Sequence, residues 1–166
     1  MIPVRVRGLV VDERSKSPIV VLQEEEGERI LPIWIGEAEA RSIGMAMAGE
    51  ALERPLTHDL LVSLIKGLRA SVSSIAITDL RDNTFFAEIR LEHDGEQVLL
   101  DARPSDSIAV ALRTGAQILV AESVMSTGQT TGLPSRKAEP SDAQRLAELR
   151  KRLEDMDPRD FGKTEL

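Results

Sequence analysis

The fold is decided by the stretch VSSIAITDLRDNTFFAEIRLEHDGEQVLL, residues 72–100. Two apolar-rich segments in it, Val72–Leu80 and Phe85–Leu91, are typical of strands, and residues 81–84 between them are typical of a turn. The pair Asp94-Gly95 indicates a tight hairpin that leads into a third strand through residues 98–100. Because such short connections join antiparallel neighbours, this part of the chain predicts antiparallel hairpins.

On either side of this stretch, the hydrophobic spacing changes between period two and helical. Before it we expect strands at residues 4–10, 19–22 and 29–35, with Pro32 indicating an edge position or a bulge. Two helices follow, one from Glu37 and one over residues 57–68 with Thr57 as its N-cap. After the stretch, residues 103–115 predict a helix that Gly115 ends, and residues 118–121 a short last strand. The expected fold class is α+β, a compact mixed fold of largely antiparallel sheets with packed helices.

The chain is expected to have three parts. Residues 1–125 form the α+β domain, residues 126–140 are rich in Ser, Thr, Gly and Pro and indicate a flexible linker, and residues 141–166 form a C-terminal tail. A capping box opens the tail, and apolar residues then recur at helical spacing, which predicts an amphipathic helix. These apolar residues are Leu146, Leu149, Leu153 and Met156. Such a helix needs a docking surface on the same chain or on a partner subunit.

Composition excludes several classes of function. The chain has no Cys and only two His, so thiolate metal sites, cysteine nucleophiles and three-histidine sites are ruled out. Aromatic residues make up 2% of the chain, too few for a base-stacking single-strand binder. We expect a soluble, cytoplasmic protein, because no segment is apolar enough to span a membrane and the first residues do not resemble a signal peptide. The net charge is −7, and no part of the sequence indicates a basic face. Nucleic acid would therefore have to be held by a local pocket or by bound cations.

Three segments contain more charged and polar side chains than a hydrophobic core requires. In the first, Glu37 and Glu39 open a helix, where they could hold a divalent metal or simply suit the helix dipole. The second, Arg54-Pro-Leu-Thr-His-Asp59, places an imidazole beside a carboxylate, either as general base or metal ligand or as part of a capping turn. The third segment is Asp101-Ala-Arg-Pro-Ser-Asp-Ser107. In one interpretation Arg103 binds a phosphate or a carboxylate. In the other, an Arg–Asp pair stabilises the junction between strand and helix.

In this order the motifs resemble the bifunctional nuclease (BFN) domain family of bacterial and plant proteins. The matching segments are Leu31-Pro-Ile-Trp-Ile-Gly36 with Glu37-Ala38, then Arg54–Asp59, then Asp101–Arg113. The resemblance extends over residues 2–125 and implies a compact α+β domain that tends to dimerise and that hydrolyses both DNA and RNA. The family's characteristic polar residues fall on Glu37, Arg54, Thr57, His58, Asp59, Arg103, Ser105 and Asp106.

On these positions we build a hypothesis for a nuclease that is metal-assisted and lacks sequence specificity. Glu37, Asp59 and Asp106 would hold Mg²⁺ or Mn²⁺. His58 would orient or deprotonate the attacking water, and Arg103 would bind the developing negative charge at phosphorus. The catalytic set is His58, Asp59, Arg103 and Asp106, and the substrate-binding set is Arg54, Thr57 and Ser105.

Two alternatives stay open. The chain could be a non-enzymatic, dimeric interaction or regulatory module, or it could bind a small anion at Arg103. A homodimer is expected because the low-bulk helix around Ile43–Ala48 and the amphipathic tail each suit a partner surface. A Ser-His-Asp triad is not expected, because the chain contains no Gly-x-Ser-x-Gly elbow.

Overall fold

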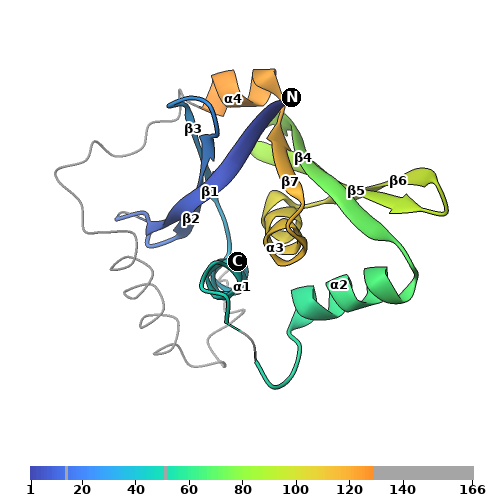
Figure 1. The fold of residues 1–166 in the computed structure, drawn as a ribbon. Coiled ribbons are helices and arrows are strands. Elements are labelled where there is room, and N and C mark those ends of the chain that lie inside the picture. Colours follow the sequence, from blue (N-terminus) through green and yellow to red (C-terminus); the bar gives the residue numbers. More distant parts are fainter. Residues whose placement is uncertain (14, 51, 129–166) are drawn as a thin grey trace.

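The computed structural model of the chain describes residues 1–13, 15–50 and 52–128. In these residues seven strands form one sheet in the order β3-β2-β1-β7-β4-β5-β6 (Figure 1). The strands are β1 (Ile2–Val11), β2 (Pro18–Glu24), β3 (Ile30–Trp34), β4 (Ser71–Arg81), β5 (Thr84–His93), β6 (Glu96–Ala102) and β7 (Gln117–Val120). The predicted α+β class and the predicted strands are confirmed, and the strands share a single sheet rather than several.

Two antiparallel meanders form the two ends of the sheet. One consists of β1, β2 and β3, and the other of β4, β5 and β6. Strand β7 joins them, because it pairs antiparallel with β1 over residues 2–4 and parallel with β4. The parallel pairing is possible because the helix α3 (Pro104–Thr114) crosses over between β6 and β7. Pro32 lies in the edge strand β3, as its missing N–H predicts.

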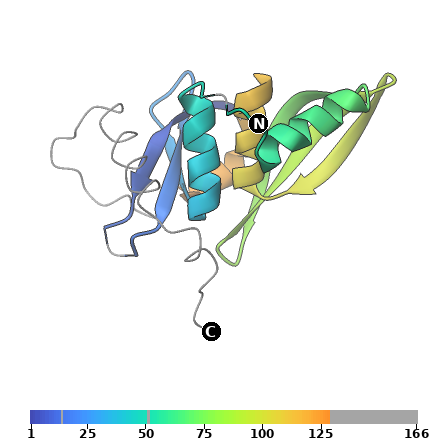
Figure 2. The ribbon, with the colours of Figure 1, turned by 90° about the horizontal axis from the view of Figure 1, so that it is seen from below.

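Helices α1 (Glu37–Met47) and α2 (Thr57–Gly67) lie on the two sides of α3 (Figure 2). Helix α3 also packs on β4 and β5. Its residues 108–111 are buried in the same core as Ile75 and Ile77 of β4. Burying each large side chain of this kind stabilises the fold by about 1.5–3 kcal/mol. The core therefore fixes α3, and with it the polar residues at the start of that helix.

One local prediction is wrong, and one helix was not predicted. Leu56, not Thr57, is the N-cap residue of α2, and Asp59 Oδ2 accepts the Leu56 N–H at 2.9 Å. This bond satisfies the backbone N–H of the N-cap residue, as the acidic residue of a capping box does. The short helix α4 (Glu122–Gly128) was not expected, and its last three residues belong to the segment interpreted as a linker. The rest of that segment and the predicted tail helix lie outside the described residues.

Helix α1, the helix with many small side chains, packs against other parts of its own chain. Ile43 is completely buried, and α1 packs against α3. This helix therefore gives no support to the expected homodimer, which stays a prediction. As for membranes, every helix found in the described ranges is too short or too polar to cross one.

Candidate active site at the helix N-termini

The three polar segments meet between α1, α2 and α3. The side chains that they bring together are Glu39 and Ser42 of α1, His58 and Asp59 of α2, and Arg103 and Asp106 at the start of α3. Pro104 occupies the first turn of α3, where its missing N–H costs nothing and its fixed backbone angle favours helix initiation. The local sequence thus starts the helices at the polar residues, and the helix packing brings those starts together.

His58 is held through both of its ring nitrogens. Its Nε2 lies 3.2 Å from Asp106 Oδ1, and its Nδ1 lies 2.8 Å from Ser42 Oγ. Because an ionised carboxylate can only accept, the Nε2–H donates to Asp106, and Nδ1 of the neutral ring accepts the Ser42 hydroxyl. The contacts therefore fix one tautomer, in which Nδ1 is the nitrogen able to take up a proton.

Arg103 links Asp106 to Glu39. Its Nε and Nη2 donate to Asp106 Oδ2 and Oδ1 at 2.7 and 3.1 Å, and Nη2 lies 2.8 Å from Glu39 Oε1. Burial alone would raise the pKa of Asp106, but hydrogen bonds from Arg103 and His58 outweigh it and bring the pKa below its ordinary value. The Arg103 side chain is 66% exposed, so an anion from solvent can approach the guanidinium.

A second ion pair, between Arg113 and Asp59, ties the three helices together. Arg113 Nε donates to Asp59 Oδ1 at 2.6 Å, Nη1 to the Ala109 carbonyl at 3.0 Å, and Nη2 to the Ser42 carbonyl at 3.3 Å. The bond from Arg113 is the main cause that lowers the pKa of Asp59 below its ordinary value. Because Arg113 is only 10% exposed, this pair positions His58 and Ser42 rather than contacting a ligand.

The structure separates Glu37 from Glu39. Residues two apart on a helix point about 200° apart, so only one of the two carboxylates can face Arg103. Glu39 is the one that does. Of the predicted substrate-binding residues, Arg54 and Thr57 lie exposed before and at the start of α2, whereas Ser105 is buried in the first turn of α3. Burial of Ser105 speaks against its expected contact with substrate.

The expected three-carboxylate metal site is not assembled. Asp59 and Asp106 are each bonded to an arginine, which occupies oxygens that a metal would need. The described ranges contain no group of three or more ligand side chains placed to hold a metal ion. Glu37, Asp59 and Asp106 therefore do not form a common ligand set here, and bound Mg²⁺ or Mn²⁺ stays a prediction from the sequence.

Sequence reasoning gave no role to Ser42 or Arg113, and it chose Glu37 instead of Glu39. A signal existed for each: Ser42 follows Glu39 by three residues, and Arg113 follows Asp106 by seven, so each pair shares one helix face. Ser42, His58 and Asp106 also stand in the order of a Ser-His-Asp triad, which was not expected. The Ser42 side chain is buried, so its hydroxyl serves the imidazole rather than presenting an open nucleophile.

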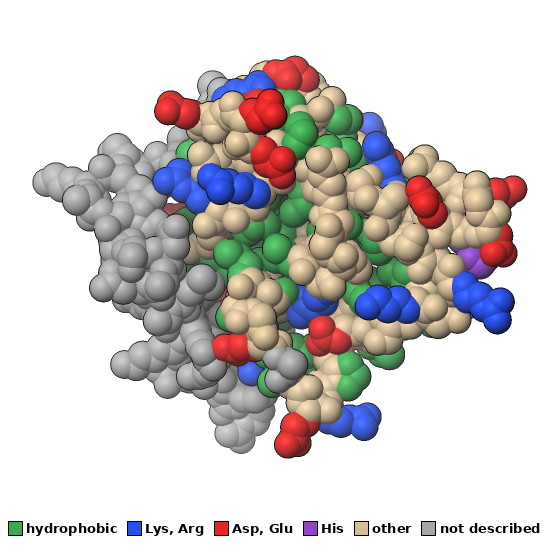
Figure 3. Space-filling model, viewed as in Figure 1, with side chains coloured by type: hydrophobic (Ala, Val, Ile, Leu, Met, Phe, Trp, Pro, Cys, Tyr) green, Lys and Arg blue, Asp and Glu red, His purple; other side chains and the backbone are tan. Residues whose placement is uncertain are grey.

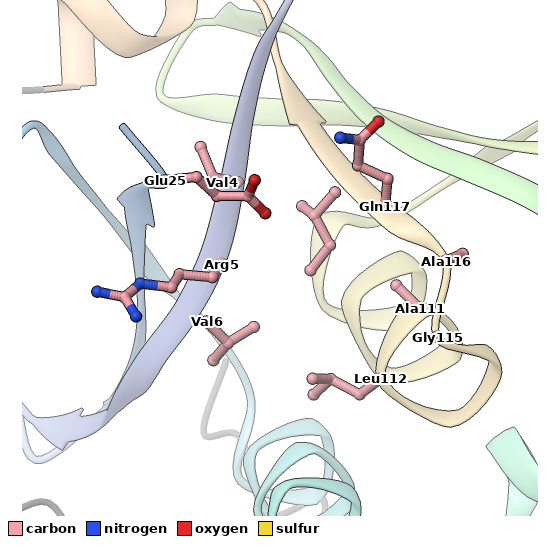
Figure 4. Close-up of a pocket in the computed structure, with 10 residues that line it drawn as sticks. Val4, Arg5, Val6, Glu25, Ala111, Leu112, Gly115, Ala116 and Gln117 are labelled. Carbon is pink, nitrogen blue, oxygen red and sulfur yellow. The ribbon is translucent and has the colours of Figure 1, made fainter. Parts of the chain in front are cut away.

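A hollow of about 480 Å³ lies elsewhere, between β1, β7 and the C-terminal end of α3 (Figure 4). Its lining includes apolar side chains such as Val6 and Leu112 together with Arg5 and Gln117. Hydrophobic side chains gather on this face of the molecule (Figure 3). Because Arg103 is not part of the lining, this hollow is not the pocket that anion binding at Arg103 would require.

Comparison with known proteins places these motifs in a family. The chain is 38% identical over 164 residues to an uncharacterized protein of Mycobacterium tuberculosis (strain CDC 1551 / Oshkosh), covering 97% of this chain and 98% of that protein. It is 28% identical over 137 residues to Bifunctional nuclease 2 of Oryza sativa subsp. japonica, covering 80% of this chain and 42% of that protein. It is 24% identical over 112 residues to Bifunctional nuclease 1 of Oryza sativa subsp. indica, covering 66% of this chain and 34% of that protein. The family model of the bifunctional nuclease domain matches residues 20–132, and the chain belongs to the bifunctional nuclease domain family.

Proposed function

We propose that this chain hydrolyses phosphodiester bonds of DNA and RNA, without sequence specificity, at the cluster around His58. The observation that carries the proposal is the imidazole held between Ser42 and Asp106 with the exposed Arg103 on the same carboxylate. The names of the plant relatives support it, although this chain spans less than half of their length. A general base next to an exposed guanidinium is the minimum that water attack on a phosphodiester requires.

Each residue has a defined task in this proposal. His58 takes up the proton of the attacking water at Nδ1, once the Ser42 hydroxyl that contacts Nδ1 turns aside and admits the water. Asp106 stabilises the imidazolium that forms, because its carboxylate accepts the Nε2–H. Arg103 binds the phosphate and its developing charge. With a net charge of −7, the protein has no general attraction for a polyanion, so this local cation is essential to binding.

No step of the proposal uses a metal ion, since the residues that the structure describes assemble no ligand set for one. The predicted Mg²⁺ or Mn²⁺ is tested directly by assaying the same preparation with EDTA, with Mg²⁺ and with Mn²⁺. Activity that persists in EDTA supports the His58 mechanism alone. Activity that requires an ion shows that a metal contributes.

The test is cleavage of labelled single-stranded DNA, double-stranded DNA and RNA by wild type, His58→Gln and Asp106→Asn. We expect His58→Gln to lower the rate by about 10²–10⁴-fold, the usual contribution of a general base. The matched control is His93→Gln, which changes the other histidine, on β5 and paired with Asp94, and should leave the rate unchanged. Equal activity of wild type and His58→Gln would reject the proposal.

One observation favours a second candidate, a non-enzymatic interaction module. Asp59, Asp106 and Glu39 are each paired with an arginine, as residues that only stabilise the helix junction would be. In that case folded wild-type protein cleaves none of the substrates under any ionic condition. The His58→Gln variant would then lose stability but no activity.

A further inference from the structure

The guanidinium to which the proposed function assigns the phosphate is partly occupied by the protein itself. Arg103 has five N–H donors, one on Nε and two on each of Nη1 and Nη2. Asp106 accepts from Nε and Nη2, and Glu39 Oε1 lies 2.8 Å from Nη2. Among the described residues, none accepts from Nη1. The protein therefore uses both donors of Nη2 and leaves those of Nη1 to a ligand.

Glu39 occupies the end of the guanidinium that a phosphate would use. A guanidinium binds a phosphate best through two parallel N–H···O bonds, either from its side, with Nε and Nη2, or from its end, with Nη1 and Nη2. Asp106 holds the side. At the end, Nη2 contacts Glu39. A phosphate can therefore contact Nη1 freely, but it gains the second bond only when Glu39 leaves Nη2.

Of the two carboxylates on Arg103, Glu39 is the one that is held less firmly. Asp106 accepts two bonds from Arg103, and its Oδ1 also lies 3.2 Å from His58 Nε2. For Glu39 the described residues supply one partner atom, Nη2 of Arg103. Arg103 carries a single positive charge, which cannot balance two carboxylates and a phosphate at once. The arrival of a phosphate therefore favours the departure of the Glu39 carboxylate.

Gly36 provides the space in which the Glu39 carboxylate lies. A Cβ added to Gly36 would overlap Glu39 Oε2. The backbone of Gly36, with φ of −73° and ψ of 160°, is accessible to any residue, so the torsion angles do not require a glycine. The missing side chain is therefore what position 36 contributes. Because the overlapping oxygen ends a flexible side chain, Gly36→Ala would displace the Glu39 carboxylate rather than the helix.

We propose that Glu39 is a built-in competitor of the phosphate for Arg103, and that it sets how strongly this site binds anions. The inference rests on the proposed function, in which Arg103 binds the phosphate of the substrate. Glu39 covers part of the guanidinium in the free protein, and an incoming phosphate displaces it. The competition weakens the binding of every anion at Arg103. A ligand that contacts the protein at Arg103 alone then binds too weakly to occupy the site, whereas a nucleic acid strand with further contacts still binds.

The test measures the affinity of the full chain for inorganic phosphate at constant pH and ionic strength. Backbone amide chemical shifts at the start of α3 follow the titration. Glu39→Gln removes the competing charge, and Gly36→Ala displaces the carboxylate while the net charge stays the same. We expect both variants to bind phosphate about 3–10-fold more tightly than wild type, which corresponds to the loss of one partly exposed, charged hydrogen bond.

The matched control is Asp101→Asn, which removes the same charge two residues before Arg103. Asp101 is exposed near the end of β6, and the structure, which describes both side chains, gives no contact between it and Arg103. Its charge acts on the phosphate only through solvent and salt, so the affinity should stay within about twofold of wild type. Circular dichroism verifies that each variant is folded. If Gly36→Ala does not fold, Gly36→Ser adds the same Cβ with a residue that is preferred at the N-cap.

Cleavage kinetics separate this inference from the proposed function. In a nuclease, Glu39→Gln lowers KM for a labelled oligonucleotide and leaves kcat unchanged, because the competition affects binding alone. A residue that merely stabilises the helix junction would not improve KM when it is replaced. If the variants bind phosphate as expected but no form of the protein cleaves nucleic acid, the nuclease proposal fails and the competition at Arg103 stands.

Four results would overturn the competition. Equal phosphate affinity of Glu39→Gln and Asp101→Asn shows that Glu39 does not compete. Weaker binding by Glu39→Gln shows that Glu39 instead positions Arg103 for the anion. Tighter binding by Glu39→Gln but not by Gly36→Ala shows that the lost charge, and not a freed Nη2, is the cause. If neither wild type nor any variant binds phosphate, Arg103 is not an anion site.

Discussion

Replacing Arg113 with methionine removes the cation that joins three helices and keeps an unbranched side chain in the core. Arg113 donates to Asp59 of α2, to the Ala109 carbonyl of α3 and to the Ser42 carbonyl of α1. In Arg113→Met the carboxylate of Asp59 loses its ion pair, and two carbonyls each lose a donor. The unfolding free energy should therefore fall.

The size of the loss follows from these three bonds. The 2.6 Å bond to Asp59 involves two charged groups, a class that contributes about 1.5–3 kcal/mol. The two carbonyl bonds contribute about 0.5–1.5 kcal/mol each. Asp59 is 38% exposed, so water replaces part of what its carboxylate loses. We expect the unfolding free energy of Arg113→Met to lie about 2–4 kcal/mol below that of wild type.

Urea unfolding followed by circular dichroism, at neutral pH and equal protein concentration, measures this difference. The matched control is Arg81→Met, because Arg81 also contacts an aspartate, Asp79, at 2.6 Å but is 69% exposed. An exposed pair contributes below about 1 kcal/mol, so this variant should be close to wild type. If Arg113→Met and Arg81→Met lose the same unfolding free energy, burial is not the reason why the Arg113 pair stabilises the fold.

Three further predictions concern single positions. The pKa of Asp59 is lowered in the folded state, so its ionised form adds stability at neutral pH that is lost as the pH falls below about 5. The difference in unfolding free energy between wild type and Asp59→Asn should therefore shrink as the pH falls through that range. A difference that stays constant with pH would contradict this prediction. Gly115 ends α3 with φ of 72°, and an added Cβ would meet nothing within 4 Å. Gly115→Ala should therefore lower the unfolding free energy by about 1 kcal/mol through backbone strain alone, and Gly115→Asn should lower it less. Thermal unfolding measures both differences. Arg29 donates to Glu24 and to Glu122 of α4, so Arg29→Met should speed amide exchange in α4 and leave exchange in α3 unchanged.

Local patterns were enough to predict every described element except α4. A period of two or 3.6 in hydrophobicity depends only on neighbouring residues, and the segments 72–80, 85–91 and 57–68 accordingly match β4, β5 and α2. The resemblance likewise pointed to His58 and Asp106, and the structure brings them within 3.2 Å. Their catalytic roles stay predictions. The cap of α2 was predicted incorrectly because Thr57 and Asp59 both suit a helix start, and only the structure shows that Thr57 is already helical and that Leu56 is the N-cap residue.

By itself, the sequence determined most of the strands and helices, the three polar segments that come together in the fold, and that the chain lacks the ligands for thiolate or three-histidine sites. The tertiary structure alone decided that two meanders form one sheet through β7, that Glu39 rather than Glu37 meets Arg103, and that Ser42 fixes the tautomer of His58. Among the described residues, it alone decided that side chains of β6 and of one side of α2 are exposed. The reason is physical: periodicity says that a face is apolar, but which neighbour covers that face depends on how helices and strands far apart in the chain pack together.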